Sequence, residues 1–405
     1  MYNVASVSNA ESKGNTAVFD PAMFTEVSSL VEGAVESGVF PGAVLLIGVR
    51  GQIAYERAFG QKVYADSKFA AEIPAALPMR TDTVFDIAGL TNILVTTTLL
   101  MKLVEGRQLS LDDRVSRYLQ GFGVHGKAAI TVGHLLAHCS GLPAWVPFYE
   151  DLLRENAGER MGILTSKGAR DYVFNAINRG ALKYPVGTRQ VYSDVGFMLL
   201  GHVIEELTGL GLDRAAQRHI FQPFGLKSTS YVDLSMIKRR GIHPVTDLIA
   251  PTEECPWRKR TLCGEVSDDN AWAMGGIAGH SGVFSTASDL HRFATRMIDA
   301  YRGESDLLAR ATVSTFWGGL AEPLDGSWKF GWDSPSKENL LADTGLSAQA
   351  VGECGFTGCS LWLEPERGID IVLMSNRVHP TRSNKKIRTF RPTLHSAVLR
   401  ALGGL

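Results

Sequence analysis

Segments with strand-like alternation lie near both ends of this chain, and their placement constrains the fold more than any other feature. Near the N-terminus, residues 41 to 60 (PGAVLLIGVRGQIAYERAFG) read as two strands joined at Arg50-Gly51, which predicts a β-hairpin. Near the C-terminus, three further segments read as strands: SWKFGWDSP (327 to 335), GECGFTGCSLWLEPE (352 to 366) and IDIVLMSNRV (369 to 378). We therefore expect one sheet assembled from the two ends of the chain.

The stretch between these strands is helical by pattern. From residue 107 to about 310, apolar residues recur at spacings of three and four. The helical segments are LSLDDRVSRYL (109 to 119), AITVGHLLAHCSGLP (129 to 143), GARDYVFNAINRG (168 to 180), SDVGFMLLGHVIEELTG (193 to 209) and DLHRFATRMIDAYRG (289 to 303). Further helices are expected from Asp20-Pro21 to about Glu36, over Leu90–Glu105 with Gly106 as C-cap, and over residues 386 to 402.

These patterns predict two domains. Residues 20 to 106 and 311 to 405 form an α/β sheet domain, residues 107 to 310 a mainly helical domain, and residues 1 to 19 a flexible N-terminal segment. The N-terminus lacks the basic start and apolar run of a secretory signal, and no apolar stretch reaches the roughly 18 to 20 residues that span a membrane. We therefore expect a cytoplasmic protein without a membrane span.

Charge and cysteine content narrow the possible ligands. The 41 Lys and Arg residues nearly balance the 42 Asp and Glu residues, so no basic surface for nucleic acid is expected. The 5 cysteines include no CxxC pair, which favours reduced thiols over a zinc site. Dinucleotide and P-loop motifs are absent. A small-molecule ligand and no cofactor or metal are expected.

Five sequence blocks occur in a characteristic order: FDIAGLTN (85 to 92), LLAHCSGLP (135 to 143), PVGTRQVYSDVGFMLLG (185 to 201), GGIAGHSGVFSTASDL (275 to 290) and GECGFTGCSLWLEP (352 to 365). Together they resemble the serine hydrolases of the penicillin-binding-protein and class C β-lactamase fold, including their esterase-like relatives, over nearly the whole chain. The resemblance implies a β-lactamase/transpeptidase-like fold of α/β plus all-α class. Its antiparallel sheet is built from the N- and C-terminal segments, flanked by helices, and a helical insertion domain meets it at a cleft.

The resemblance also implies where catalysis would take place, and this chain departs from the family there. In the family, the Ser of a Ser-x-x-Lys motif attacks an acyl carbon and the Lys one helical turn later takes its proton. Here those positions are Gly89 and Asn92. The strand position that carries Lys or His in the family is Glu353, whereas the assisting tyrosine is kept as Tyr192. The two backbone amides that hold the oxyanion, at Gly89 and Phe356, need no particular side chain.

The degenerate motif predicts loss of acyl-enzyme chemistry, because removing a nucleophile and its base typically costs about 10⁶ in kcat. We expect a homologue that binds a small molecule in the inter-domain cleft, or binds a protein. One alternative is a repurposed enzyme in which Tyr192 and Glu353, or less favourably Cys354 as nucleophile, perform isomerisation or cyclisation. Another is a structural or assembly protein, with a possible homo-oligomer.

Several cleft positions have both a functional and a structural interpretation. Glu353 is either a base or cation-binding group, or a solvated residue or partner of an arginine. Asp194 either accepts a ligand amine or, as we favour, caps the helix that begins near Gly196. Cys354 is read as a structural thiol. His134 and His138 have the i, i+4 spacing of metal ligands, but the LLAHCSGLP block already accounts for them.

Overall fold

The computed structural model describes residues 19–64, 78–157, 163–322 and 324–403. All but the last residue of the N-terminal segment expected to be flexible, residues 1 to 19, lies outside the described residues. Near the start of the described part, the Asp20 side chain accepts a hydrogen bond from the Ala22 amide and so caps the first helical turn, Pro21–Phe24.

The main sheet has five antiparallel strands in the order β2-β1-β10-β9-β8. Their bounds are β1 Gly42–Val49, β2 Gln52–Gly60, β8 Val351–Cys354, β9 Ser360–Glu364 and β10 Ile369–Ser375. The N-terminal hairpin joins the C-terminal strands through β1 and β10, whose register runs from Ala43 opposite Ser375 to Val49 opposite Ile369. The expectation of one antiparallel sheet built from both ends of the chain is confirmed.

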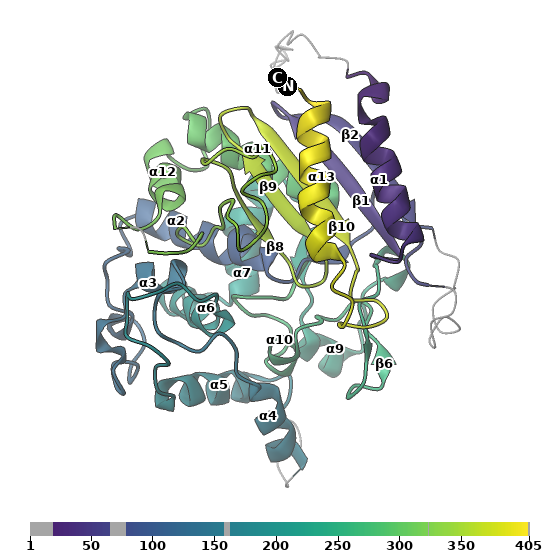
Figure 1. Cartoon of the computed structure of the whole chain (residues 1–405). Helices are drawn as coiled ribbons and strands as arrows, with labels where there is room; N and C mark the ends of the chain where they lie inside the picture. Colours follow the sequence, from purple (N-terminus) through teal and green to yellow (C-terminus); the bar gives the residue numbers. More distant parts are fainter. Residues whose placement is uncertain (1–18, 65–77, 158–162, 323, 404–405) are drawn as a thin grey trace, which may run out of the picture.

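Helices cover both faces of this sheet (Figure 1). Every residue of β1 is buried, and alternate side chains enter two different apolar cores. Leu45 and Ile47 pack with α1 (Thr25–Glu36) and α13 (Ile387–Ala401), whereas Val44 and Leu46 belong to the larger core that includes α2 (Thr98–Glu105) and α11 (Ala287–Arg302). The arrangement therefore has three layers, with β1 buried on both sides.

The remaining elements lie in the middle of the chain and beside the sheet. The helices are α3 Val132–Leu136, α4 Phe148–Ala157, α5 Lys167–Arg179, α6 Asp194–Thr208, α7 Leu212–Ala216, α8 Gln222–Phe224, α9 Leu234–Arg240, α10 Asp269–Ala273 and α12 Arg310–Gly318. Short strands form two small sheets, β3 (Phe85–Asp86) with β7 (Val283–Ser285) and β4 (Ser230–Tyr231), and β5 (Glu254–Cys255) with β6 (Arg260–Thr261).

Some local expectations were wrong. The segment 327 to 335 forms no strand, and only Asp333 pairs with the sheet, through a bridge to Gly352. Its alternation instead reflects Trp332, which is fully buried, and a left-handed turn at Gly331 with a φ of 81°. The segment 352 to 366 is two strands rather than one, because the chain turns between Cys354 and Ser360.

Residues 109 to 119 also differ from the expected helix. They contain only a 3₁₀ turn, Val115–Arg117. The Ser110 amide donates to the Asp113 carboxylate, and such local side-chain hydrogen bonds compete with helix formation. At the end of α2, Gly106 is the C-cap but has a φ of −74°, and Arg107 takes the left-handed conformation with a φ of 54°.

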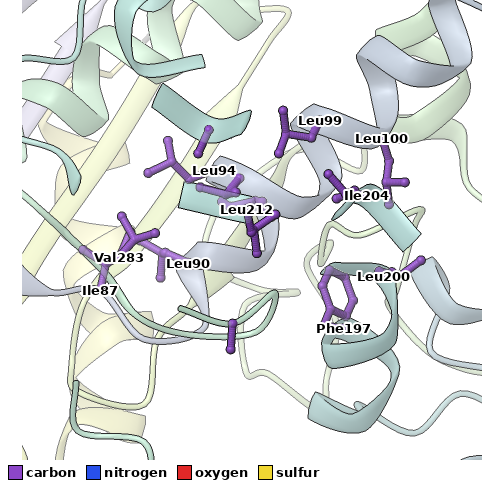
Figure 2. Packing of buried hydrophobic residues seen from close by; sticks show 14 of the residues in the cluster. Ile87, Leu90, Leu94, Leu99, Leu100, Phe197, Leu200, Ile204, Leu212 and Val283 are labelled. Atoms are coloured by element: carbon purple, nitrogen blue, oxygen red, sulfur yellow. The ribbon is translucent and has the colours of Figure 1, made fainter. Parts of the chain in front are cut away.

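The helix that follows β3 is buried from Leu90 to Met101 and fixes the position of residue 89. It begins near Leu90, continues through a π-helical stretch, Asn92–Thr97, and ends as α2. Figure 2 shows its leucines beside Phe197, Leu200 and Ile204 of α6, and these side chains belong to one apolar core. Packing of this kind holds the start of the helix rigidly.

Within the described residues, no single helix is long and apolar enough to cross a membrane. Only α6 taken together with Leu212–Phe224 reaches that length, and these two segments meet at a bend of 75°.

Candidate active site

A cavity of about 510 Å³ lies where β3, the N-terminus of α6 and the end of β8 meet. Cavities of this size hold small molecules. All the residues expected at the cleft line it: Gly89, Tyr192, Asp194, Glu353, Cys354 and Phe356. A larger cavity of about 940 Å³ lies beside α9 and contains none of them.

The turn that leads to Gly89 is held by a buried carboxyl group. Ala88 has a φ of 46°, a strained conformation for a residue with a side chain. The Asp86 carboxyl accepts hydrogen bonds from the Ala88 amide at 2.9 Å and from the Ser267 amide at 2.7 Å. Asp86 therefore ties the strained turn to the loop before α10.

We predict that this carboxyl group makes stability depend on pH. Burial raises the pKa of Asp86 to about 7, although the hydrogen bonds from its two amide donors partly oppose this shift. Between about pH 4 and pH 7 the folded protein therefore holds a proton that the unfolded chain releases, and stability falls as the pH rises. In Asp86→Asn, the fall in the free energy of unfolding across this range should be smaller by about 1 to 4 kcal/mol.

Chemical denaturation at several pH values measures this difference in slope. Asp343→Asn, which neutralises an exposed carboxyl in a loop, is the matched control and should keep the wild-type slope. Equal slopes in wild type and Asp86→Asn would contradict the role given to Asp86.

Glycine is not required by the backbone at position 89. Its φ is outside the left-handed region, and a Cβ built there would meet one neighbour, the Tyr192 hydroxyl oxygen, at 3.1 Å. The turn can therefore accept a short side chain after a small shift of the tyrosine. What the glycine removes is the side-chain oxygen that the family resemblance places next to this tyrosine.

Asn92 lies beneath the same tyrosine and does not line the cavity. It is 1% exposed, and its Nδ2 donates a hydrogen bond to the Tyr192 hydroxyl at 3.0 Å. Its Oδ1 atom has no hydrogen-bond partner among the described residues. A carboxamide cannot accept a proton near neutral pH, so Asn92 positions the tyrosine without supplying a base.

Tyr192 is held between aromatic rings and polar partners. Its ring centroid lies 4.7 Å from that of His138 and 5.2 Å from that of Trp328. Burial raises the pKa of its hydroxyl well above the usual value, and the nearby Asp194 and Glu353 act in the same direction. The hydroxyl is therefore a neutral hydrogen-bond donor at physiological pH.

The capping role expected for Asp194 was wrong. Ser193 is the N-cap of α6, because its Oγ accepts a hydrogen bond from the Gly196 amide at 3.1 Å. The Asp194 carboxyl instead lines the cavity and accepts a hydrogen bond from Tyr192. Burial raises the pKa of Asp194 to about 6, with the nearby His280 opposing the shift.

Glu353 is neither solvated nor paired with an arginine. It is 3% exposed at the end of β8, and its Oε1 accepts a hydrogen bond from the Cys354 amide at 2.9 Å. Its Oε2 has no partner among the described residues. Burial raises the pKa of Glu353 well above its usual value, and the nearby Asp333 adds to the shift.

Cys354 also lines the cavity. Burial raises the pKa of its thiol, although the nearby Arg391 partly opposes this. Because the thiolate is the nucleophilic form, this environment disfavours a catalytic cysteine.

The two histidines of LLAHCSGLP have structural partners. His134 takes part in a capping box with Thr131 at the start of α3. The Nδ1 atom of His138 accepts a hydrogen bond from the Ser193 amide at 3.0 Å, and burial lowers its pKa to about 3. No group of three His, Cys, Asp or Glu side chains suited to a metal ion occurs in the described parts of the chain.

The structure adds cavity residues that were not singled out as site residues: Trp145, Trp328, Asp268, Asp269, Asp333 and Arg382. Asp268 accepts a hydrogen bond from His280 at 3.0 Å, so the loop before α10 meets the family block of residues 275 to 290 here. Only the second of these segments is one of the five family blocks. Trp328 and Asp333 lie in the segment 327 to 335, which was predicted to be a strand, and Arg382 lies in no recognisable motif.

Comparisons with known proteins agree with this fold. The family model described as Beta-lactamase matches residues 27–392. An N-acetylmuramyl-L-alanine amidase from Bacillus subtilis (strain 168) is 32% identical over 385 residues, covering 90% of this chain and 83% of the relative. A putative D-alanyl-D-alanine carboxypeptidase from Escherichia coli (strain K12) is 29% identical over 388 residues, covering 91% and 86%.

Solved structures show the same fold at lower identity. EstCE1, a hydrolase with promiscuous acyltransferase activity, has a TM-score of 0.69 at 20% identity, covering 93% of this chain and 98% of its own. The octameric penicillin-binding protein homologue from Pyrococcus abyssi has a TM-score of 0.68 at 20% identity, covering 93% and 77%.

Proposed function

Because the chain belongs to the Beta-lactamase family, we propose that it binds a small molecule in the family's cleft without forming an acyl-enzyme. The observation that carries this proposal is the pair of residues beneath Tyr192. Gly89 offers no side-chain oxygen there, and Asn92 donates a hydrogen bond where the family resemblance places a proton-accepting lysine. Neither side chain can form or activate a covalent bond to an acyl group.

Two features support retention of binding. The backbone amides of Gly89 and Phe356 donate no hydrogen bond to any other described residue, and both residues line the cavity. These amides remain available to a ligand carbonyl oxygen. The cavity volume of about 510 Å³ suits a compact ligand.

We predict that the wild-type protein forms no covalent adduct with acylating probes. The native protein is incubated with a fluorescent fluorophosphonate, a fluorescent penicillin and p-nitrophenyl acetate, and intact mass and nitrophenol release are followed. We expect neither a stoichiometric mass increase nor turnover above that of heat-unfolded protein. An adduct that forms on the native but not on the unfolded protein would overturn the proposal.

A second candidate function is acid-base catalysis, and the state of Glu353 favours it. A buried carboxyl with a raised pKa can donate a proton near neutral pH. Glu353 is also close enough to Tyr192 to contribute to the raised pKa of the Tyr192 hydroxyl. In that case the wild type turns over a metabolite and Glu353→Gln does not. Mass spectrometry of a host metabolite extract, incubated with wild type or with Glu353→Gln, separates this function from binding alone.

A further inference from the structure

Carboxyl groups dominate the polar lining of the cavity. Five line it, Asp194, Asp268, Asp269, Asp333 and Glu353, against two basic side chains, His280 and Arg382. The basic groups are already engaged: His280 pairs with Asp268 at 3.0 Å, and Arg382 pairs with Asp269 at 2.7 Å. Asp194, Asp333 and Glu353 therefore face the cavity without an ion-pair partner among the described residues.

Glu353 carries an unmet hydrogen-bonding requirement. Asp333 accepts hydrogen bonds from the Ser334 amide and from Asn339, both at 2.9 Å, and Asp194 accepts one from Tyr192. By contrast, the Oε2 atom of Glu353 is buried and has no partner in the described structure. A buried acceptor without a donor costs about 1 to 3 kcal/mol, which a ligand N–H group at this position would recover.

The neighbouring walls are aromatic. Tyr192 and Trp328 pack with a centroid separation of 5.2 Å and an interplanar angle of 43°. Trp145, which is 46% exposed, also lines the cavity. Aromatic faces attract cations through the ring quadrupole, most strongly where water is partly excluded.

From the unpartnered Glu353 oxygen, the unpaired Asp194 and the aromatic walls, we infer that the cavity takes a ligand with a compact cationic group, an amine or an amidine. Its N–H groups donate to Glu353 and Asp194. This inference rests on the proposed function, since it describes a reversible complex. The inference also explains the consequence of having Glu353 where the family carries a cation. A carboxyl group at this position favours a positively charged ligand group, whereas a cation would favour a negatively charged one.

Binding of such a cation should release protons. Burial raises the pKa of Glu353 well above its usual value and that of Asp194 to about 6. A cation stabilises the ionised carboxylates and so lowers both pKa values. The groups that face them include Tyr192, Asp268 and His280 around Asp194, and Asp333 and Arg391 around Glu353. Affinity for a cation should therefore rise from about pH 5 to pH 7, as Asp194 ionises.

The test uses three probes of nearly equal shape: benzamidine, benzamide and benzoate. Isothermal titration at pH 7, in two buffers with different ionisation enthalpies, gives each dissociation constant and the number of protons released. We expect benzamidine to bind at least about tenfold more tightly than benzamide and to release protons, and benzoate to bind most weakly. Equal affinity for benzamidine and benzamide, a preference for benzoate, or no binding of benzamidine would overturn the inference.

Two variants that each remove one carboxyl group test whether the cation binds at Glu353 and Asp194. Glu353→Gln and Asp194→Asn should each lower the affinity for benzamidine by about tenfold while changing that for benzamide little. Glu32→Gln is the matched control, because it removes an exposed carboxylate of α1 that does not line the cavity, and it should bind benzamidine like the wild type. Unchanged affinity in both cavity variants, with wild-type thermal midpoints, contradicts the inference.

The outcomes of the two proposals are separable. Labelling of the native wild type by fluorophosphonate defeats the non-covalent function, whatever the benzamidine affinity is. Absence of labelling together with equal affinity for the three probes leaves the non-covalent function standing and defeats only the assignment of a cationic ligand.

Discussion

The double variant Gly89→Ser/Asn92→Lys is expected to react with a fluorescent fluorophosphonate at least about 100-fold faster than the wild type. The backbone at residue 89 accepts a side chain, and its Cβ would lie 3.1 Å from the Tyr192 hydroxyl oxygen. Residue 92 already directs its side chain to that hydroxyl, at 3.0 Å. A hydroxyl and an amine introduced at these positions would therefore converge on one tyrosine.

The gain should fall short of a full family enzyme. The family resemblance places a cation at the strand position, and Glu353 occupies it here without a basic partner among the described residues. A carboxyl group there opposes development of negative charge on the acyl oxygen. We therefore expect labelling on a timescale of minutes to hours, with little hydrolysis of the adduct.

The control for this experiment is Gly89→Ala/Asn92→Lys. It carries the same added Cβ and the same lysine but lacks the hydroxyl, so it reports any effect of the substitutions on folding. Labelling is followed by in-gel fluorescence and intact mass, and thermal midpoints are compared between the two variants. If the serine variant folds like the alanine variant and labels no faster, the cleft has lost more than its nucleophile and base.

The largest loss of stability is expected from Arg258→Met. The Arg258 side chain is 1% exposed and lies over two indole rings, 4.8 Å from the centroid of Trp257 and 5.1 Å from that of Trp272. It donates to the Val266 and Ser267 carbonyl oxygens and to Asp269 at 2.8 Å. Removing one partner of such a buried network typically costs about 3 to 5 kcal/mol.

The Arg258→Met substitution should also affect residues that line the cavity. The carbonyl of Ser267 and the carboxylate of Asp269 bond to Arg258, and both residues line the cavity. Without the guanidinium, Arg382 and Trp257 are the side-chain donors left to Asp269 within the described part of the chain. The loop before α10 then keeps its hydrogen bonds to Asp86 and Arg382 but loses those to Arg258, and benzamidine binding should weaken in parallel with stability.

Arg260→Met is the matched control, because it removes the same group from a residue in the same segment. The Arg260 side chain is 51% exposed and pairs with Glu265 at 2.7 Å, so its loss should cost no more than about 1 kcal/mol. Urea denaturation of both variants gives the two free energies of unfolding. Equal losses would mean that the Arg258 network contributes no more than a surface pair.

The elements predicted well from the sequence are those whose pattern is local. The hairpin of β1 and β2 is visible because a strand buried on both faces is continuously apolar and a turn at Arg50-Gly51 follows it. Helix α13 is visible from its periodic apolar face. The segment 327 to 335 misled the prediction, because its alternation serves a buried core and a cavity rather than a strand.

The residues that line the cavity also divide into those that a local sequence motif indicates and those that it does not. Gly89, Tyr192 and Glu353 could be located because each lies inside a family motif. Asp333 and Arg382 could not, since no local pattern indicates that two loops far apart in the chain reach the same cavity. The capping role predicted for Asp194 failed for a similar reason: Ser193 is one residue earlier, and only the backbone course decides which side chain caps α6.

The sequence alone determined which atoms are missing: position 89 has no side-chain oxygen, and position 92 has a carboxamide where the family resemblance places an amine. It also indicated the fold, through the apolar patterns of the terminal strands and of several helices and through the order of the five family blocks. Only the tertiary structure decided that Asn92 hydrogen-bonds to Tyr192 and that a buried Glu353 oxygen has no partner among the described residues. The physical reason is that burial, pKa and hydrogen bonding depend on neighbours from distant segments, which meet only when the chain is folded.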